Sequence, residues 1–122
     1  DDAHIHRDRL GAPASSWGQA GVLHLGVTHA PYTRVVSALA SAGSDLILAG
    51  HTHGGQIGIP GCGAIITNCD IARRYAKGLN RWEAPDGSQS WLHVSAGLGT
   101  SPYAKIRIAT RPEASIIHVH PA

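Results

Sequence analysis

The chain has 122 residues, of which 15% are charged, and its formal net charge is only +2. Lys and Arg are scattered along the sequence rather than clustered, so a basic face for binding nucleic acid is not indicated. No apolar run approaches the ~20 residues of a membrane helix, and no signal peptide is visible. The length fits one domain, residues 1–122, and the lack of any Met indicates that the chain begins inside a longer reading frame.

The first part of the sequence predicts a strand, a helix and a second strand. Residues 1–20 are polar and rich in Gly, Pro and Ser, which is typical of a loop. Gly21–Thr28 is an apolar run that predicts a buried strand, and Tyr32–Ala42 has apolar residues at helical spacing. Asp45–Ala49 then predicts another buried strand. This order is a βαβ unit, so we expect the two strands to be parallel.

The second part of the sequence has the shorter periodicity of β-structure. Gln56–Ile59 and Ala64–Thr67 are separated by a Gly/Pro-rich turn and predict a hairpin. Asp70–Lys77 predicts one or two helical turns. Four further strands are expected, at Gly78–Trp82, Gln89–Ser95, Lys105–Thr110 and Ser115–His120.

Histidines follow the second predicted strand in the segment Gly50-His51-Thr52-His53-Gly54-Gly55-Gln56. In extended backbone, residues two apart point to the same side with Cα atoms about 6–7 Å apart. His51 and His53 are therefore expected to share one space, where they bind one ion or serve two neighbouring ions. The flanking glycines carry no Cβ, which lets the chain turn sharply and a ligand approach closely.

A third histidine, His29, ends the first predicted strand and is followed by Pro31, a favoured first residue of a helix. Ligands of α/β proteins lie at the carboxyl ends of the strands, so the ends of these two strands predict a metal site. His24 is an odd number of residues from His29 and leaves the opposite face of the strand. We interpret His24 as a core or packing histidine.

These motifs resemble the C-terminal half of the calcineurin-like metallophosphoesterases. The resemblance is carried by His29, by the Gly-His-Thr-His-Gly-Gly-Gln segment of the bacterial branch, and by two later stretches. Those stretches are Val94-Ser95-Ala96-Gly97-Leu98-Gly99-Thr100-Ser101-Pro102 and Ile106-Arg107-Ile108 before Arg111-Pro112-Glu113. The implied fold is half of a four-layer α/β/β/α sandwich, with a mixed sheet and few helices.

The resemblance implies a dinuclear site that hydrolyses phosphate mono- or diesters with metal-activated water. His29 and His51 would bind one divalent ion and His53 the other, with Mn, Fe or Zn as the metal. Thr52 would be a spacer, while Gly54 and Gly55 would bind substrate by keeping the site open to the phosphate.

The same resemblance exposes what the chain lacks. The family supplies negative charge through Gly-Asp and Gly-Asn-His motifs, and neither occurs here. Asp2-Ala3-His4 matches the family's first metal motif, but no strand precedes it, so we interpret Asp2, His4 and His6 as loop residues. The catalytic residues and carboxylate ligands are expected in a missing N-terminal half.

The chain alone is therefore expected to be inactive, with at most partial metal occupancy. It should expose an apolar edge or face that normally packs on the missing half, which favours self-association or domain swapping. Two alternatives remain: a complete small module in which the three histidines hold one zinc ion, and a non-catalytic interaction domain on a degenerate scaffold.

The remaining candidate residues are interpreted as structural or solvated. Cys62 and Cys69 are spaced more widely than the about two to four residues of zinc-binding pairs, so we expect buried thiols. His93 is expected to be structural, and His118 and His120 to lie on the solvated side of the last strand. A basic face is expected from Arg73, Arg74 and Lys77, with contact to an anionic substrate as the alternative.

Overall fold

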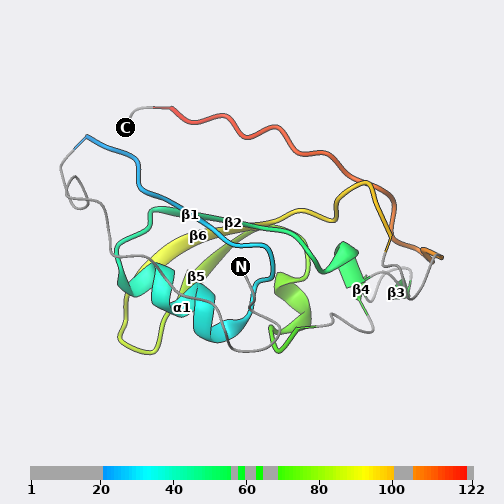
Figure 1. Ribbon diagram of the computed structural model, residues 1–122, viewed down its shortest axis with the longest axis horizontal. Helices are drawn as coiled ribbons and strands as arrows, with labels where there is room; N and C mark the ends of the chain where they lie inside the picture. The colour runs from blue at the N-terminus through cyan, green and yellow to red at the C-terminus, as the bar shows by residue number, and fades with distance from the viewer. Residues whose placement is uncertain (1–20, 56–57, 60–62, 65–68, 101–105, 121–122) are drawn as a thin grey trace.

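The computed structural model describes residues 21–55, 58–59, 63–64, 69–100 and 106–120. These residues form a small α/β structure around a four-stranded mixed sheet in the order β1-β2-β6-β5 (Figure 1). The strands are β1 (Leu25–Val27), β2 (Leu46–Ala49), β5 (Gly78–Glu83) and β6 (Gln89–Val94). β2 is parallel to both β1 and β6, whereas β5 is antiparallel to β6. The predicted α/β class and mixed sheet are confirmed.

The helix of the predicted βαβ unit is α1 (Thr33–Ser41), which lies against one face of the sheet (Figure 1). Its buried residues are Val35, Val36 and Ala40, at the spacing that places side chains on one helical face. The helix ends where Gly43 adopts a φ of 93°, a conformation that costs glycine little. The predicted strand–helix–strand order is confirmed, although β1 is shorter than predicted because Val22 and Leu23 lie outside the sheet and are exposed.

The hydrophobic core lies between α1 and the sheet. Ile47 on β2 is aligned with Leu92 on β6, and both are completely buried. The ring of Trp82 packs edge-on against that of Tyr75, with centroids 5.0 Å apart. Tyr75 belongs to a single 3₁₀ turn, η3 (Arg73–Tyr75), which confirms the helical turn predicted for this region. Burial of these large side chains supplies the main driving force for folding.

The opposite face of the sheet carries several exposed apolar side chains, and the guanidinium of Arg81 lies over the ring of one of them, Trp91. The strand register aligns Leu25 with Leu46 and Trp91, and Val27 with Leu48 and His93. Val27 is 71% exposed, and Leu25 and Trp91 are also exposed. These exposures are compatible with the predicted apolar face, and its packing on a missing half stays a prediction.

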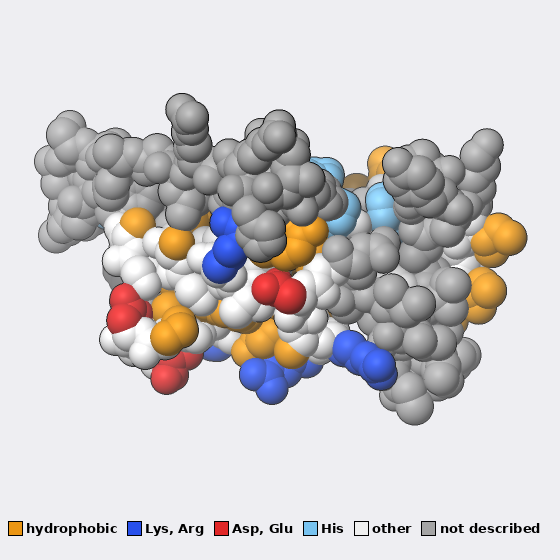
Figure 2. Space-filling model, turned by 60° about the horizontal axis from the view of Figure 1, so that its bottom comes forward, with side chains coloured by type: hydrophobic (Ala, Val, Ile, Leu, Met, Phe, Trp, Pro, Cys, Tyr) orange, Lys and Arg blue, Asp and Glu red, His pale blue; other side chains and the backbone are white. Residues whose placement is uncertain are grey.

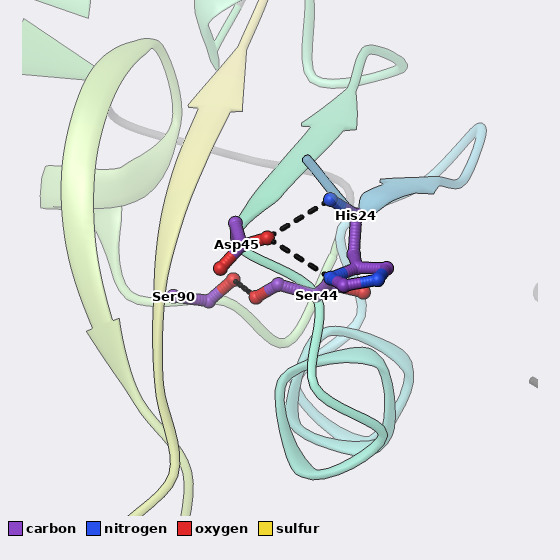
Figure 3. A network of polar contacts seen from close by, with 4 residues as sticks. All are labelled: His24, Ser44, Asp45 and Ser90. Carbon is purple, nitrogen blue, oxygen red and sulfur yellow. Dashed lines mark hydrogen bonds and ion pairs between the residues drawn. The ribbon is translucent and has the colours of Figure 1, made fainter. Parts of the chain in front are cut away.

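The amino ends of β1 and β2 are joined by a polar contact network (Figure 3). The backbone N–H of His24 donates to Oδ2 of Asp45 at 2.9 Å, and the His24 ring Nδ1 lies 3.2 Å from the same oxygen. In return, the backbone N–H of Asp45 donates to the carbonyl of His24. Ser90 Oγ donates to the carbonyl of Ser44, which extends the contacts to β6. The interpretation of His24 as a buried packing residue is confirmed.

The prediction of two strands near the C-terminus is wrong for the described residues. Within 106–110 only Ile108 forms a bridge, and 111–120 is extended without a strand partner. These residues return along the side of the sheet opposite α1 (Figure 1). A strand needs a continuous ladder of backbone hydrogen bonds, whereas among the described residues 111–120 the N–H of Glu113 donates to the carbonyl of Gly97 without forming such a ladder. His118 and His120 are exposed as expected, with stacked rings 6.4 Å apart.

The predicted hairpin is confirmed only at its described residues, where β3 (Gly58–Ile59) pairs antiparallel with β4 (Gly63–Ala64). Its remaining residues lie outside the described ranges, as do residues 1–20 with Asp2, His4 and His6, and also Cys62. Among the residues that the structure describes, no helix has the length and apolar character needed to cross a membrane.

The side chain of Cys69 is half-buried and packs against the core. Burial, reinforced by the nearby Asp70 carboxylate, raises the pKa of this thiol from 9.0 to about 12. Because the thiolate is the reactive form, native Cys69 should react with a disulfide reagent at pH 8 at least about 100-fold more slowly than in urea. The measurement uses Cys62→Ser, so that only Cys69 is labelled, and equal rates in the two conditions would contradict the expectation.

Candidate metal site

His29 and His51 meet where β1 and β2 end. Nδ1 of His51 lies 3.1 Å from Nε2 of His29, and the ring centroids are 5.0 Å apart. The parallel pairing holds these ends together, because the backbone N–H of Thr28 donates to Leu48 and that of Gly50 donates to His29. The structure therefore brings together two of the three histidines predicted as metal ligands.

The separation of these two nitrogens suits joint coordination of one ion. Two nitrogen ligands about 2.0–2.1 Å from an ion are about 2.8–3.4 Å apart when the angle between them at the ion lies between about 90° and about 109°. The observed 3.1 Å falls in this interval. The described residues contain no cluster of three or more His, Cys, Asp or Glu side chains arranged to hold an ion. The described part of the chain thus offers two imidazole nitrogens at a distance that suits one ion.

The backbone after β2 is not extended as predicted. His51 has a φ of 65° and His53 a φ of 50°, both in the left-handed region. The chain turns into η2 (His53–Gly55), where the N–H of Gly55 donates to the carbonyl of Thr52. The expectation that His51 and His53 point to one side because of extended geometry is therefore wrong. Left-handed conformations cost non-glycine residues about 1–2 kcal/mol, and such strain is concentrated at functional sites.

Thr52 anchors this turn, a role beyond that of the spacer implied by the family resemblance. Its side chain is buried, and Oγ1 donates to the carbonyl of Ala76 at 2.6 Å. The same oxygen accepts from the backbone N–H of Gly54 at 3.3 Å. The only sequence signal was a hydroxyl-bearing residue between two histidines, and its partner, 24 positions later, could not be read from the sequence.

We expect Thr52→Val to lower the free energy of unfolding by about 1–3 kcal/mol. Valine keeps the shape of threonine but removes the donor to the carbonyl of buried Ala76. Urea unfolding followed by tryptophan fluorescence measures the change. Thr52→Ser is the control, because it keeps the hydroxyl. A valine variant as stable as the wild type would show that this hydrogen bond does not anchor the turn.

Gly54 and Gly55, the predicted substrate-binding glycines, are both buried with positive φ angles of 65° and 84°. A Cβ on Gly54 would lie 2.5 Å from Cγ2 of Thr110 and 3.2 Å from Cβ of Ala96. Glycine is thus required at position 54 by close packing as well as by backbone conformation. Contact of either glycine with substrate stays a prediction.

His53 faces a different group from the other two histidines. Its Nδ1 lies 3.5 Å from Nη2 of Arg107, and its ring donates to the carbonyl of Gly99. Burial lowers the pKa of His53 below 6.5, and the Arg107 guanidinium and His29 lower this pKa further, against the opposing effect of Gly99. The neutral imidazole, which is the form that binds metal ions, is therefore favoured.

The lowered pKa of His53 predicts a dependence of stability on pH. Below 6.5 the unfolded chain binds more protons at this residue than the folded chain does, so unfolding becomes easier as pH falls. We expect His53→Gln to show a smaller loss of stability than the wild type between pH 7 and pH 5, both without metal. Urea unfolding across this range measures the slopes, and identical slopes would contradict the assignment.

Among the basic candidates, Lys77 lies next to the turn of the site, because its Cδ is 3.6 Å from the position that a Cβ on Gly54 would take. Arg73, Arg74 and Lys77 are all exposed, and Nη2 of Arg74 donates to the hydroxyl of Tyr75. On the face shown in Figure 2, Lys and Arg side chains lie at separate places among hydrophobic and acidic side chains. His93 lies half-buried on the sheet face opposite α1.

Comparison of the sequence with protein-family models and with curated proteins, and of the structure with solved structures, found no match in any of the three. The candidate function therefore depends on the arrangement of the site itself.

Proposed function

We propose that this chain is the C-terminal part of a dinuclear metal-dependent phosphoesterase that hydrolyses phosphate mono- or diesters. The observation that carries the proposal is the approach of His29 Nε2 and His51 Nδ1 to 3.1 Å at the carboxyl ends of two parallel strands. A pair of imidazole nitrogens at this distance matches two ligands of one divalent ion.

The histidines have distinct roles in this proposal. His29 and His51 hold one ion through the facing nitrogens, and His53 serves the second ion. When bound, two ions of Mn, Fe or Zn would neutralise phosphoryl oxygens and lower the pKa of a coordinated water. The lowered pKa of His53 keeps its imidazole neutral near pH 7, as a ligand must be. In this proposal the phosphate approaches the ions beside the turn that contains Gly54 and Gly55.

The exposed side chains on one face of the sheet support the proposal that the chain is part of a larger domain. Leu25, Val27 and Trp91 form an apolar surface on the side of the sheet away from α1. A second sheet packed about 10 Å away would bury it and complete an α/β/β/α sandwich. In our proposal the N-terminal half supplies that sheet together with the bridging carboxylate. Without the N-terminal half, the same face favours self-association of the chain. Analytical ultracentrifugation tests this expectation, and a chain that stays monomeric at high concentration would contradict it.

A direct test measures metal content and hydrolysis by the same preparation. We expect the 122-residue chain to bind at most one equivalent of Mn²⁺, Fe²⁺ or Zn²⁺ and not to hydrolyse a generic aryl phosphodiester. Two tightly bound ions with turnover would overturn the fragment proposal, because the chain or its oligomer would then complete the site. Binding of no ion under any condition would remove the basis for a metal centre here.

A mononuclear zinc-binding module is the second candidate. Its specific support is the 3.1 Å separation of the facing nitrogens of His29 and His51, which suits a single ion, with His53 as the third ligand. Tight binding of one zinc ion per chain that is lost in His53→Gln would support this candidate over the dinuclear fragment, in which His53 serves the other ion.

A further inference from the structure

The guanidinium of Arg107 is surrounded by backbone carbonyls. Nη2 donates to Ala96 at 2.7 Å and to Gly97 at 2.9 Å, and Nε donates to Gly99 at 3.0 Å. Nη1 donates to the carbonyl of Arg111 at 3.3 Å, and Nη2 has a further contact with the Gly99 carbonyl. One side chain thus ties the loop after β6, residues 96–99, to the segment that follows residue 106.

This arrangement uses donors on all three nitrogens of the guanidinium. Arginine is a donor only, and its planar fork is directed at carbonyl oxygens through Nε, Nη1 and Nη2. The side chain is half-buried, so reorientation toward a phosphate would leave several of these carbonyls without a donor. Arg107 is therefore built to hold the protein backbone rather than to bind an anionic substrate.

The loop held by Arg107 lies against the candidate metal site. The carbonyl of Gly99 accepts a hydrogen bond from the ring of His53, and Nη2 of Arg107 lies 3.5 Å from Nδ1 of the same ring. A hydrogen bond that a metal-binding histidine donates to a backbone carbonyl fixes which ring nitrogen carries the proton and how the ring is oriented. Arg107 holds the Gly99 carbonyl through its own hydrogen bond from Nε.

We propose that Arg107 is a positioning residue: by holding the carbonyls of Ala96, Gly97 and Gly99, it orients the His53 ring for metal binding without touching ion or substrate. The metal-binding part rests on the proposed function. A point charge cannot replace the guanidinium, because lysine cannot direct separate donors to carbonyls on both sides of its head group.

The test compares Arg107→Lys and Arg107→Ala with the matched control Arg111→Ala. The exposed Arg111 lies in the same segment and contributes only its backbone carbonyl to the network. In the metal-free 122-residue chain, ¹⁵N resonances of the His53 ring report its tautomer, and amide exchange reports the loop. We expect both Arg107 variants to change the tautomer ratio of His53 and to speed exchange of the Gly97 amide about tenfold or more. Arg111→Ala should change neither.

Titration with Co²⁺ then separates positioning from general stability. In the Arg107 variants we expect the first Co²⁺ ion to bind the His29–His51 pair with unchanged affinity, because Arg107 acts on the His53 ring and not on this pair. Unaltered His53 ring resonances in Arg107→Lys would overturn the inference, even if stability decreased. If the wild type bound no Co²⁺ but the Arg107 variants still changed the tautomer ratio of His53, the proposed function would be wrong. The positioning of the His53 ring by Arg107 would still be supported. Arg107→Lys is the decisive variant if Arg107→Ala does not fold.

Discussion

Gly54→Ala is expected to lower the free energy of unfolding by about 2–5 kcal/mol. Two costs add, since alanine at a φ of 65° loses about 1–2 kcal/mol and overpacking loses about 1–3 kcal/mol more. The overpacking arises because the new Cβ would lie 2.5 Å from Cγ2 of Thr110. Chemical denaturation in urea measures the effect, which would unfold a marginally stable domain at physiological temperature.

Two controls separate the costs at Gly54. Gly87 has a φ of 85° but no atom within 4 Å of its Cβ position, so Gly87→Ala should show the conformational cost alone. Thr110→Ser removes Cγ2 while keeping the hydroxyl that donates to Ile108. In the Thr110→Ser background, Gly54→Ala should cost less than in the wild type. Equal costs for Gly54→Ala and Gly87→Ala would show that Thr110 does not crowd this position.

Replacing either histidine of the facing pair is expected to lower the affinity for the first Co²⁺ ion by about 100-fold or more. Each replacement removes one of the two nitrogens that lie 3.1 Å apart, a larger loss than the about 10–100-fold effect of disturbing outer contacts. Suitable variants are His29→Gln and His51→Asn, since asparagine tolerates the left-handed conformation found at position 51. The visible absorption of bound Co²⁺ provides the measurement.

His118→Gln is the matched control for the pair. His118 is also a member of a His-x-His sequence, but it is exposed and its ring stacks on that of His120 rather than facing it edge-on. We expect this variant to bind the first ion as the wild type does. If His51→Asn retained full affinity while His118→Gln lost it, the ion would belong to the C-terminal segment and the proposed centre would be wrong.

The parts of the fold that were predicted depend on local patterns. The helical spacing of apolar residues located α1, and the apolar runs located β2 and β6. The burial of Ile47, Val36 and Leu92 follows from these patterns, because the spacing of apolar residues marks the face of a helix or strand that packs on the core. His29 and His51 were predicted to converge because both follow parallel strands, and their nitrogens are in contact.

The errors lie where distant segments decide the local conformation. The turn after β2 departs from extended geometry because Thr52 bonds to Ala76 and Gly54 packs against Thr110. Residues 115–120 alternate like a strand, but the described structure offers no neighbour to complete one. The hydrogen bonds of Arg107 could not be predicted, because three backbone carbonyls, those of Ala96, Gly97 and Gly99, meet its side chain only in the folded protein. No spacing of residues in the sequence indicates such a contact.

The sequence alone determined the α/β class, the βαβ unit and the choice of His29, His51 and His53 as candidate ligands, because side-chain periodicity and residue chemistry are local properties. Only the tertiary structure decided that His29 faces His51 while His53 lies beside Arg107 and Gly99. Ring orientation is set by backbone torsions and by hydrogen bonds to residues far along the chain, and these become defined only when the segments pack.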